Sequence, residues 1–136
     1  MSVVSGKRSI PKLDALIKAQ RLVKHVLWIT KNEKYFDLSY KALIEDINHC
    51  AERIYINAYT ANNIYAQGQN NMEQRVKLET MSILECKSML ALIDLAWGIF
   101  HLKSNKVECV VKMTEETEKA LQSWRRRDKE KLKEYT

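Results

Sequence analysis

The chain has 136 residues and a mass of 16.0 kDa, a size that fits one domain and leaves no room for separate cofactor and substrate domains. Three Gly and one Pro supply few turns, and this composition argues against an all-β fold. A net charge of +6 and a pI near 9.2 favour an anionic partner without identifying it.

The first part of the chain predicts a basic segment followed by a helix. Residues 1–10 lack an apolar period beyond two valines, so we expect a flexible N-terminus. A helix is expected over residues 11–31, because Ser9 offers a capping hydroxyl and Pro11 suits a first helical turn. Its expected buried stripe, in steps of three and four, is Leu13, Leu16, Gln20, Val23 and Leu27.

A second helix is expected over residues 36–66, after a polar stretch at residues 30–34. Its apolar positions follow the most regular heptad in the sequence: Phe36, Tyr40, Leu43, Ile47, Cys50, Ile54, Asn57, Ala61 and Ile64. Gly68 stands where a helix stop is expected, and the polar residues after it read as a loop.

Two further helices are expected, over residues 70–102 and 104–132. The stripe of the third is Met72, Val76, Glu79, Ile83, Cys86, Leu90, Ile93, Trp97 and Phe100, widened by Leu84, Met89 and Ala96. Ser104 and Asn105 suit a helix start, with Glu108 three residues after the asparagine. The stripe of the fourth is Val107, Val110, Thr114, Thr117, Leu121 and Trp124.

Four amphipathic helices with short links bury their stripes together only as a bundle. The predicted fold is therefore all-α, an antiparallel up-down-up-down four-helix bundle over residues 11–132. The longest apolar stretch, residues 89–100, contains Asp94 and is too short to span a bilayer, so no membrane segment is expected. An odd number of cysteines and the lack of an apolar secretory segment favour the reducing cytoplasm.

No residue pattern in the sequence is typical of catalysis. The sequence has no glycine-rich phosphate loop and no Gly-x-Ser-x-Gly motif, and adjacent carboxylates diverge around a helix. Cys50, Cys86 and Cys109 lie near buried stripes; they could gather around a metal, but without paired ligand spacing they read as structural thiols. We expect no enzyme activity, no cofactor and no metal site.

Two polar residues, Asn57 and Glu79, fall on apolar stripes, where an unpaired amide or charge is costly. Two interpretations stay open for them. Either they mark register and a contact with a partner, or the assigned phase of the helix is one residue off at that turn.

The charge is concentrated at the two ends of the chain. Residues 1–24 hold six basic and one acidic residue, and residues 119–136 hold seven and three, whereas the middle is net acidic. In an up-down-up-down bundle the two basic segments meet at one end. They are either solvated helix ends or a polyanion site, and the expected nucleic-acid-binding residues are Lys7, Arg8, Lys12, Arg21, Lys24, Arg125, Arg126, Arg127 and Lys129.

Several motifs resemble one family of four-helix bundles over residues 10–130. They are the run from Phe36 to Tyr40, the run from Ala61 to Tyr65, Arg75, the apolar segment from Cys86 to Phe100, and Trp124 followed by the basic run from Arg125 to Lys129. Together they resemble the accessory variability determinant (Avd) proteins of diversity-generating retroelements. Asp37 departs from the pattern, since many members have a proline after the phenylalanine; this departure affects only the entry to the second helix.

The resemblance implies a small, basic, non-enzymatic protein that forms a ring-like homopentamer. It would bind a retroelement reverse transcriptase and its template RNA, with DNA as a further candidate ligand, and support synthesis of complementary DNA. The alternative is a protein-interaction module like the four-helix bundles encoded in intervening sequences of ribosomal RNA genes, without a reverse-transcriptase partner. Aromatic residues off the apolar stripes would suit subunit contacts, and these are Trp28, Tyr35, Tyr55 and Tyr59.

Overall fold

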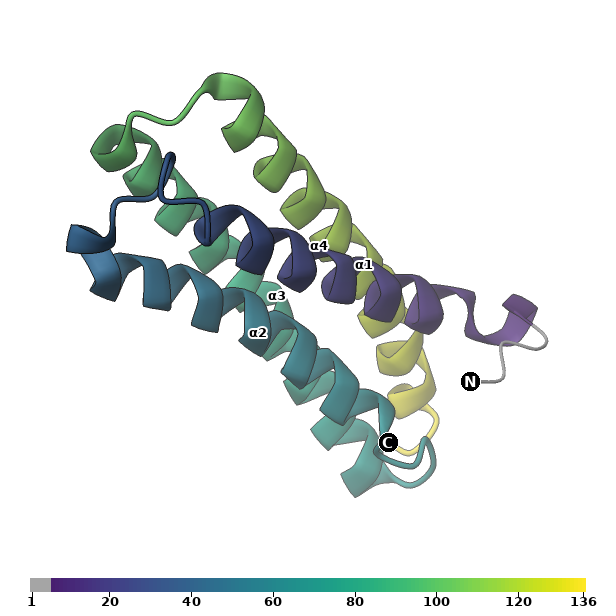
Figure 1. Ribbon diagram of the computed structural model, residues 1–136. Coiled ribbons are helices and arrows are strands. Elements are labelled where there is room, and N and C mark those ends of the chain that lie inside the picture. Colours follow the sequence, from purple (N-terminus) through teal and green to yellow (C-terminus); the bar gives the residue numbers. More distant parts are fainter. Residues whose placement is uncertain (1–5) are drawn as a thin grey trace.

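The computed structural model describes the backbone of residues 6–136 and the side chains of residues 12–136 (Figure 1). The elements over this range are helix α1 (Gly6–Thr30), the short 3-10 helix η1 (Leu38–Tyr40), and helices α2 (Lys41–Asn62), α3 (Gln69–Phe100) and α4 (Ser104–Lys133). The described residues contain no β-strand. The expected all-α fold with four long helices is confirmed.

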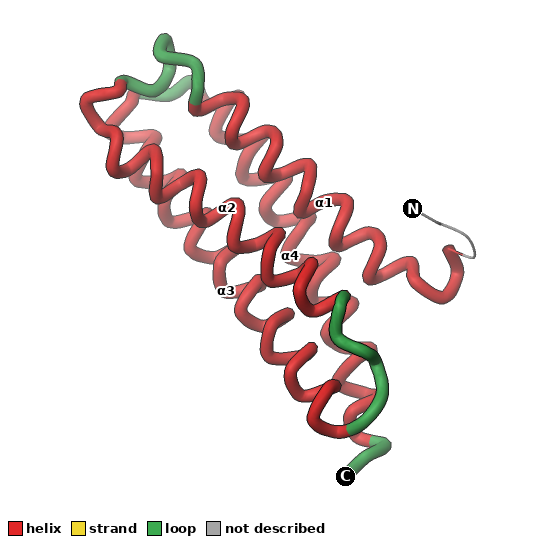
Figure 2. Tube along the Cα trace, turned by 60° about the horizontal axis from the view of Figure 1, so that its bottom comes forward, coloured by secondary structure: helices red, strands yellow, loops and turns green. Residues whose placement is uncertain are grey.

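The helices pack side by side as a bundle. Helices α1 and α3 each contact both α2 and α4, so the four contacts close a cycle around one core. Figures 1 and 2 show the α1–α2 and α3–α4 links together at one end, while the α2–α3 link lies at the other end near the C-terminus. We call these the Phe36 end and the Arg75 end, after the buried side chain that each contains.

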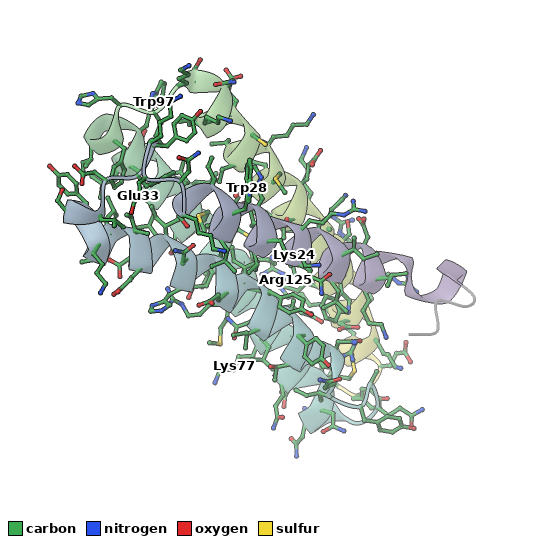
Figure 3. The ribbon with its side chains drawn as sticks, viewed as in Figure 1. Lys24, Trp28, Glu33, Lys77, Trp97 and Arg125 are labelled. Atoms are coloured by element: carbon green, nitrogen blue, oxygen red, sulfur yellow. The ribbon has the colours of Figure 1, made fainter. Side chains whose placement is uncertain are left out.

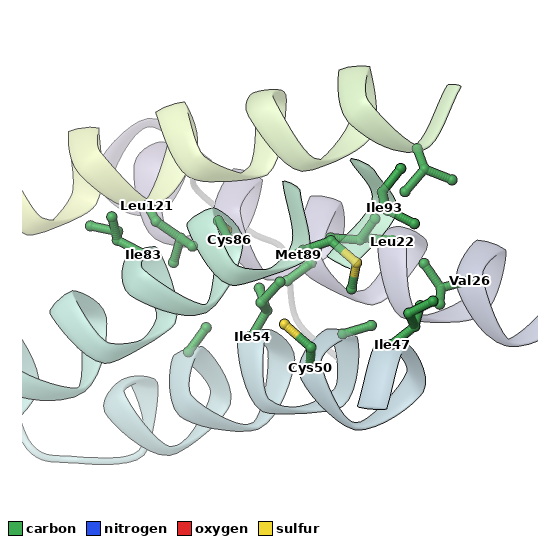
Figure 4. Packing of buried hydrophobic residues seen from close by; sticks show 14 of the residues in the cluster. Leu22, Val26, Ile47, Cys50, Ile54, Ile83, Cys86, Met89, Ile93 and Leu121 are labelled. Atoms are coloured by element: carbon green, nitrogen blue, oxygen red, sulfur yellow. The ribbon is translucent and has the colours of Figure 1, made fainter. Parts of the chain in front are cut away.

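One apolar core runs along the bundle, and all four helices contribute to it (Figure 4). The side chains labelled in that view are Leu22, Val26, Ile47, Cys50, Ile54, Ile83, Cys86, Met89, Ile93 and Leu121. Burial of these groups supplies most of the free energy that holds helices of this length together. Within the described part of the chain, no helix has the length and apolarity needed to cross a membrane.

Helix α1 begins at Gly6, within the segment expected to be flexible, and residues 1–5 lie outside the described residues. Helix α2 is shorter than predicted, 41–62 in place of 36–66. At its start, the Asp37 side chain accepts a hydrogen bond from the Ser39 backbone N–H at 3.0 Å, which caps η1 and turns the chain before α2.

Most buried positions of α1 lie one residue before the predicted ones. The buried positions are Ala15, Ala19, Leu22, Val26 and Ile29, whereas the predicted Gln20 and Leu27 are exposed. Alanine at two of the buried positions leaves a weak hydrophobic signal, because a methyl group contributes little apolar area. Larger neighbours such as Leu16 pack half-buried at the margin of the core. Their larger apolar side chains give the stronger hydrophobic pattern, so the sequence predicts them as the buried face.

Three other residues assigned to the core stripes are exposed. On α3, Leu84 and Trp97 are 55% and 46% exposed. Both point outward because Met89, Ile93 and Ala96 already fill the side of α3 that faces the core. Tyr40 is also exposed, since it belongs to η1 and not to α2.

Candidate nucleic-acid interface

The predicted basic residues of α4 lie on its outer surface. Arg126, Arg127 and Lys129 are exposed. Arg125 is half-buried, and its Nη1 donates a hydrogen bond to Thr80 Oγ1 of α3 at 3.2 Å. Three of them, Arg125, Arg126 and Lys129, line an open hollow together with Gln122, Glu130 and Lys133. A polyanion therefore finds several cations on one helix face.

Asp128, which interrupts this basic run in the sequence, faces the interior. Its carboxylate is nearly buried and forms an ion pair with Arg75 of α3, with a separation of 3.1 Å between Nη2 and Oδ2. A carboxylate held inside the bundle and paired there contributes little repulsion toward an anion at the surface. The exposed acidic residues of this segment are Glu130 and Glu134.

The basic residues of α1 lie on the helix that packs beside α4. Arg21 and Lys24 are exposed and Lys12 is half-buried. Figure 3 labels Lys24 on α1 and Arg125 on α4. The backbone of Lys7 and Arg8 lies in α1, but their side chains are outside the described ones. The structure thus places the two predicted groups on neighbouring helices.

Arg75 is buried at the point where three helices meet. Its Nη1 donates to the Ile64 carbonyl oxygen after α2 at 2.9 Å, and its Nε donates to Asp128 Oδ2 of α4 at 3.1 Å. The guanidinium carbon lies 5.6 Å from the ring centre of Trp124, a cation–π distance. The helical spacing of Arg75 and Glu79, with Asp128 one turn after Trp124, is the sequence signal for this cluster.

Glu79 lies on the buried side of α3, as the heptad assignment places it, and it is fully buried. Neither of its carboxylate oxygens has a hydrogen-bond partner in the described part of the chain. Burial raises the pKa of Glu79 well above its usual range, and the nearby Asp128 carboxylate adds to this; Arg75 and Arg125 only partly offset it. Glu79 is therefore neutral at physiological pH. The other polar residue on an apolar stripe, Asn57 of α2, is half-buried.

The cysteines and the other potential ligands do not assemble into a metal centre among the described side chains. No group of three or more His, Cys, Asp or Glu residues is close enough to hold an ion there. Cys50 and Cys86 are buried free thiols, and Cys109 is an exposed one. Burial, and secondarily Glu85, raises the pKa of Cys50 to about 12, so the thiolate that binds metals is not formed at neutral pH.

The four predicted interface aromatics form two separate pairs. Tyr55 and Tyr59 lie on α2 with ring centres 5.8 Å apart, and Tyr59 is the more exposed of the two. Trp28 on α1 is 65% exposed, and it shares a surface hollow with the half-buried Tyr35. These residues therefore supply two patches on the described surface and not one continuous face.

Comparison with known proteins leaves the family open: no family model, no curated protein and no solved structure matches this chain.

Proposed function

We propose that this protein is a non-enzymatic accessory protein that binds nucleic acid through the outer surface of α4 and the neighbouring α1. The observation that carries the proposal is the arrangement of the basic run. Arg126, Arg127 and Lys129 are exposed, while the acidic residue among them, Asp128, is buried against Arg75. This leaves exposed cations on α4, of which Arg126 and Lys129 line one open hollow together with Arg125 and Lys133.

The binding mechanism is phosphate neutralisation. Exposed guanidinium and ammonium groups contact backbone phosphates and release condensed counterions. Contacts of this kind position a nucleic acid without reading its sequence. Binding is therefore weakly sequence-dependent and weakens steeply as salt is added.

The resemblance to Avd proteins supplies the biological part of the proposal. The partner is a retroelement reverse transcriptase with its template RNA, and the protein supports synthesis of complementary DNA in the cytoplasm. We also propose an antiparallel up-down-up-down topology and a homopentamer. Exposed apolar side chains support self-association, among them Tyr59 on α2 and Met81, Leu84 and Leu95 on α3. A pentameric mass in native mass spectrometry is the expected result; a monomer contradicts the assembly.

The central experiment compares two charge-matched double variants in RNA and DNA binding at two salt concentrations. Arg126→Gln with Arg127→Gln removes two cations from the proposed surface. Lys41→Gln with Lys77→Gln removes two exposed cations from α2 and α3 as the control. We expect the arginine variant to bind about tenfold more weakly at low salt. The slope of the logarithm of the binding constant against the logarithm of salt concentration should become shallower by about one to two.

Equal binding by the two double variants would contradict the assigned surface. Wild-type affinity no greater than that of an unrelated basic protein of the same charge would favour the protein-interaction module. A reverse-transcriptase gene beside the gene for this protein is the expected genomic context, whereas a position inside a ribosomal RNA gene favours the other family.

A further inference from the structure

The outer face of α1 carries a tryptophan within a basic stripe. Arg21, Lys24, Trp28 and Lys31 follow one another in steps of three, four and three, which places them on one side of a helix. All four are exposed. No acidic residue occurs between Ala15 and Asn32, so nothing in this stretch of sequence offsets the charge.

Trp28 borders a hollow at the Phe36 end of the bundle. The hollow has a volume of about 360 Å³, and its lining residues are Trp28, Ile29, Lys31, Asn32, Tyr35 and Lys106. It therefore combines two aromatic rings with two ammonium groups from separate parts of the chain. Lys106 lies 5.2 Å from the ring centre of Tyr35. Glu33, labelled in Figure 3, is exposed in the same link but is not a lining residue.

The indole of Trp28 lies beside the ring of His25, the residue one turn before it. The His25 ring centre lies 6.0 Å from that of Trp28, with 41° between the planes. Burial and the Lys106 charge lower the pKa of His25, so a neutral imidazole supports the indole from the protein side. With 65% of its surface exposed, Trp28 offers a broad apolar area to solvent.

Trp97 is the other exposed tryptophan, at 46% against 65% for Trp28. The hollow beside it includes two carboxylates, Glu108 and Glu115, and one ammonium group, Lys112. An aromatic ring beside cations suits a ligand that is flat and anionic. Carboxylates beside the ring would repel such a ligand. The surroundings of Trp28 favour a nucleobase with its phosphates.

We propose that Trp28 is a stacking platform for a base of a single-stranded nucleic acid, with Lys24 and Lys31 contacting the phosphates on either side. This inference rests on the proposed nucleic-acid function and adds the form of nucleic acid that is bound. An unpaired base exposes its flat face to the indole, whereas a base inside a duplex is already stacked on its neighbours. Trp28 then faces nucleic acid and not a second subunit.

The test uses the full chain and three tryptophan variants. Trp28→Leu removes the ring, Trp28→Phe keeps an aromatic surface, and Trp97→Leu is the control at the other exposed tryptophan. The probes are a single-stranded oligonucleotide and the duplex of the same sequence. We expect Trp28→Leu to bind the single strand about tenfold more weakly than wild type, with the duplex changed less than twofold, and Trp28→Phe to recover most of the loss.

Intrinsic fluorescence gives a second reading. The single strand should quench wild-type emission, and this quenching should persist in Trp97→Leu and disappear in Trp28→Leu. Equal single-strand affinity of Trp28→Leu and Trp97→Leu, while the arginine double variant binds weakly, would overturn the stacking inference alone. If neither the arginine nor the tryptophan variants alter binding, the proposed function fails as well. A changed oligomer mass in Trp28→Leu would assign Trp28 to a subunit contact and overturn the inference.

Discussion

The two ends of the bundle are closed by different chemistry. At the Phe36 end, the Phe36 side chain is 1% exposed, and its ring centre lies 4.9 Å from that of Phe100. The Tyr40 ring packs edge-on against Phe100, with 5.5 Å between the ring centres. At the Arg75 end, the corresponding interior position holds a guanidinium, with the Asp128 carboxylate and the neutral Glu79 beside it.

This difference separates two ways of joining helices. Aromatic packing at the Phe36 end depends on buried area and shape, so it tolerates small shifts and does not respond to pH. Arg75 instead donates along fixed directions to the end of α2 and to α4, and an ion pair of this kind is costly to break from one side. The Arg75 end therefore fixes the register of three helices.

The largest expected effect is at the Arg75 end. Arg75→Ala leaves the Asp128 carboxylate without its partner inside the bundle and frees the Ile64 carbonyl. We expect the free energy of unfolding to fall by about 4 kcal/mol, measured by urea unfolding at pH 7. The double variant Arg75→Met with Asp128→Leu removes both charges and should recover most of this loss. A single variant as stable as wild type would contradict the importance of the pair.

Phe36→Ala tests the other end and should cost about 3 kcal/mol through lost apolar burial and a cavity. The loss should be the same at pH 5 and pH 8, because the ring packs against Phe100, which does not titrate. Leu38→Ala in η1 is the control, since Leu38 is exposed and its truncation should change stability by less than about 0.5 kcal/mol. A loss that varies with pH would show that the two ends are coupled.

The third expected effect is a gain in stability at alkaline pH. Folded Glu79 keeps its proton while the unfolded chain releases it above the ordinary value of 4.5, so wild-type stability declines as pH rises from there. Glu79→Gln removes this decline, so its free energy of unfolding relative to wild type should be greater at pH 8 than at pH 5. Glu73→Gln, an exposed carboxylate on the same helix, should show no such change. A parallel pH profile for wild type and Glu79→Gln would contradict a buried neutral carboxyl.

How far the fold follows from sequence depends on the size of the buried side chains. In α2 the buried residues Ile47 and Ile54 are large, and the heptad places them correctly. In α1 the buried Ala15 and Ala19 are small, and the pattern selects bulkier neighbours. Close approach of helices through small residues is a tertiary property, so local hydrophobicity does not reveal it.

Part of the candidate site also follows from the sequence, and part does not. Exposure of Arg126 and Lys129 follows from their places off the apolar stripe of α4. The burial of Asp128 does not, because it depends on Arg75, which is 53 residues away in the chain. Long-range charge pairing leaves no local periodicity, and the sequence signal is only a charged residue at a core position.

The Arg75 contact also orders events during synthesis. Arg75 and the Ile64 carbonyl after α2 are 11 residues apart, so the α2–α3 hairpin can form this bond as soon as both segments leave the ribosome. The anion that neutralises Arg75 is made more than fifty residues later. Until α4 packs against the hairpin, Arg75 lacks its carboxylate partner. The ion pair at the Arg75 end therefore forms only after α4 has been synthesised.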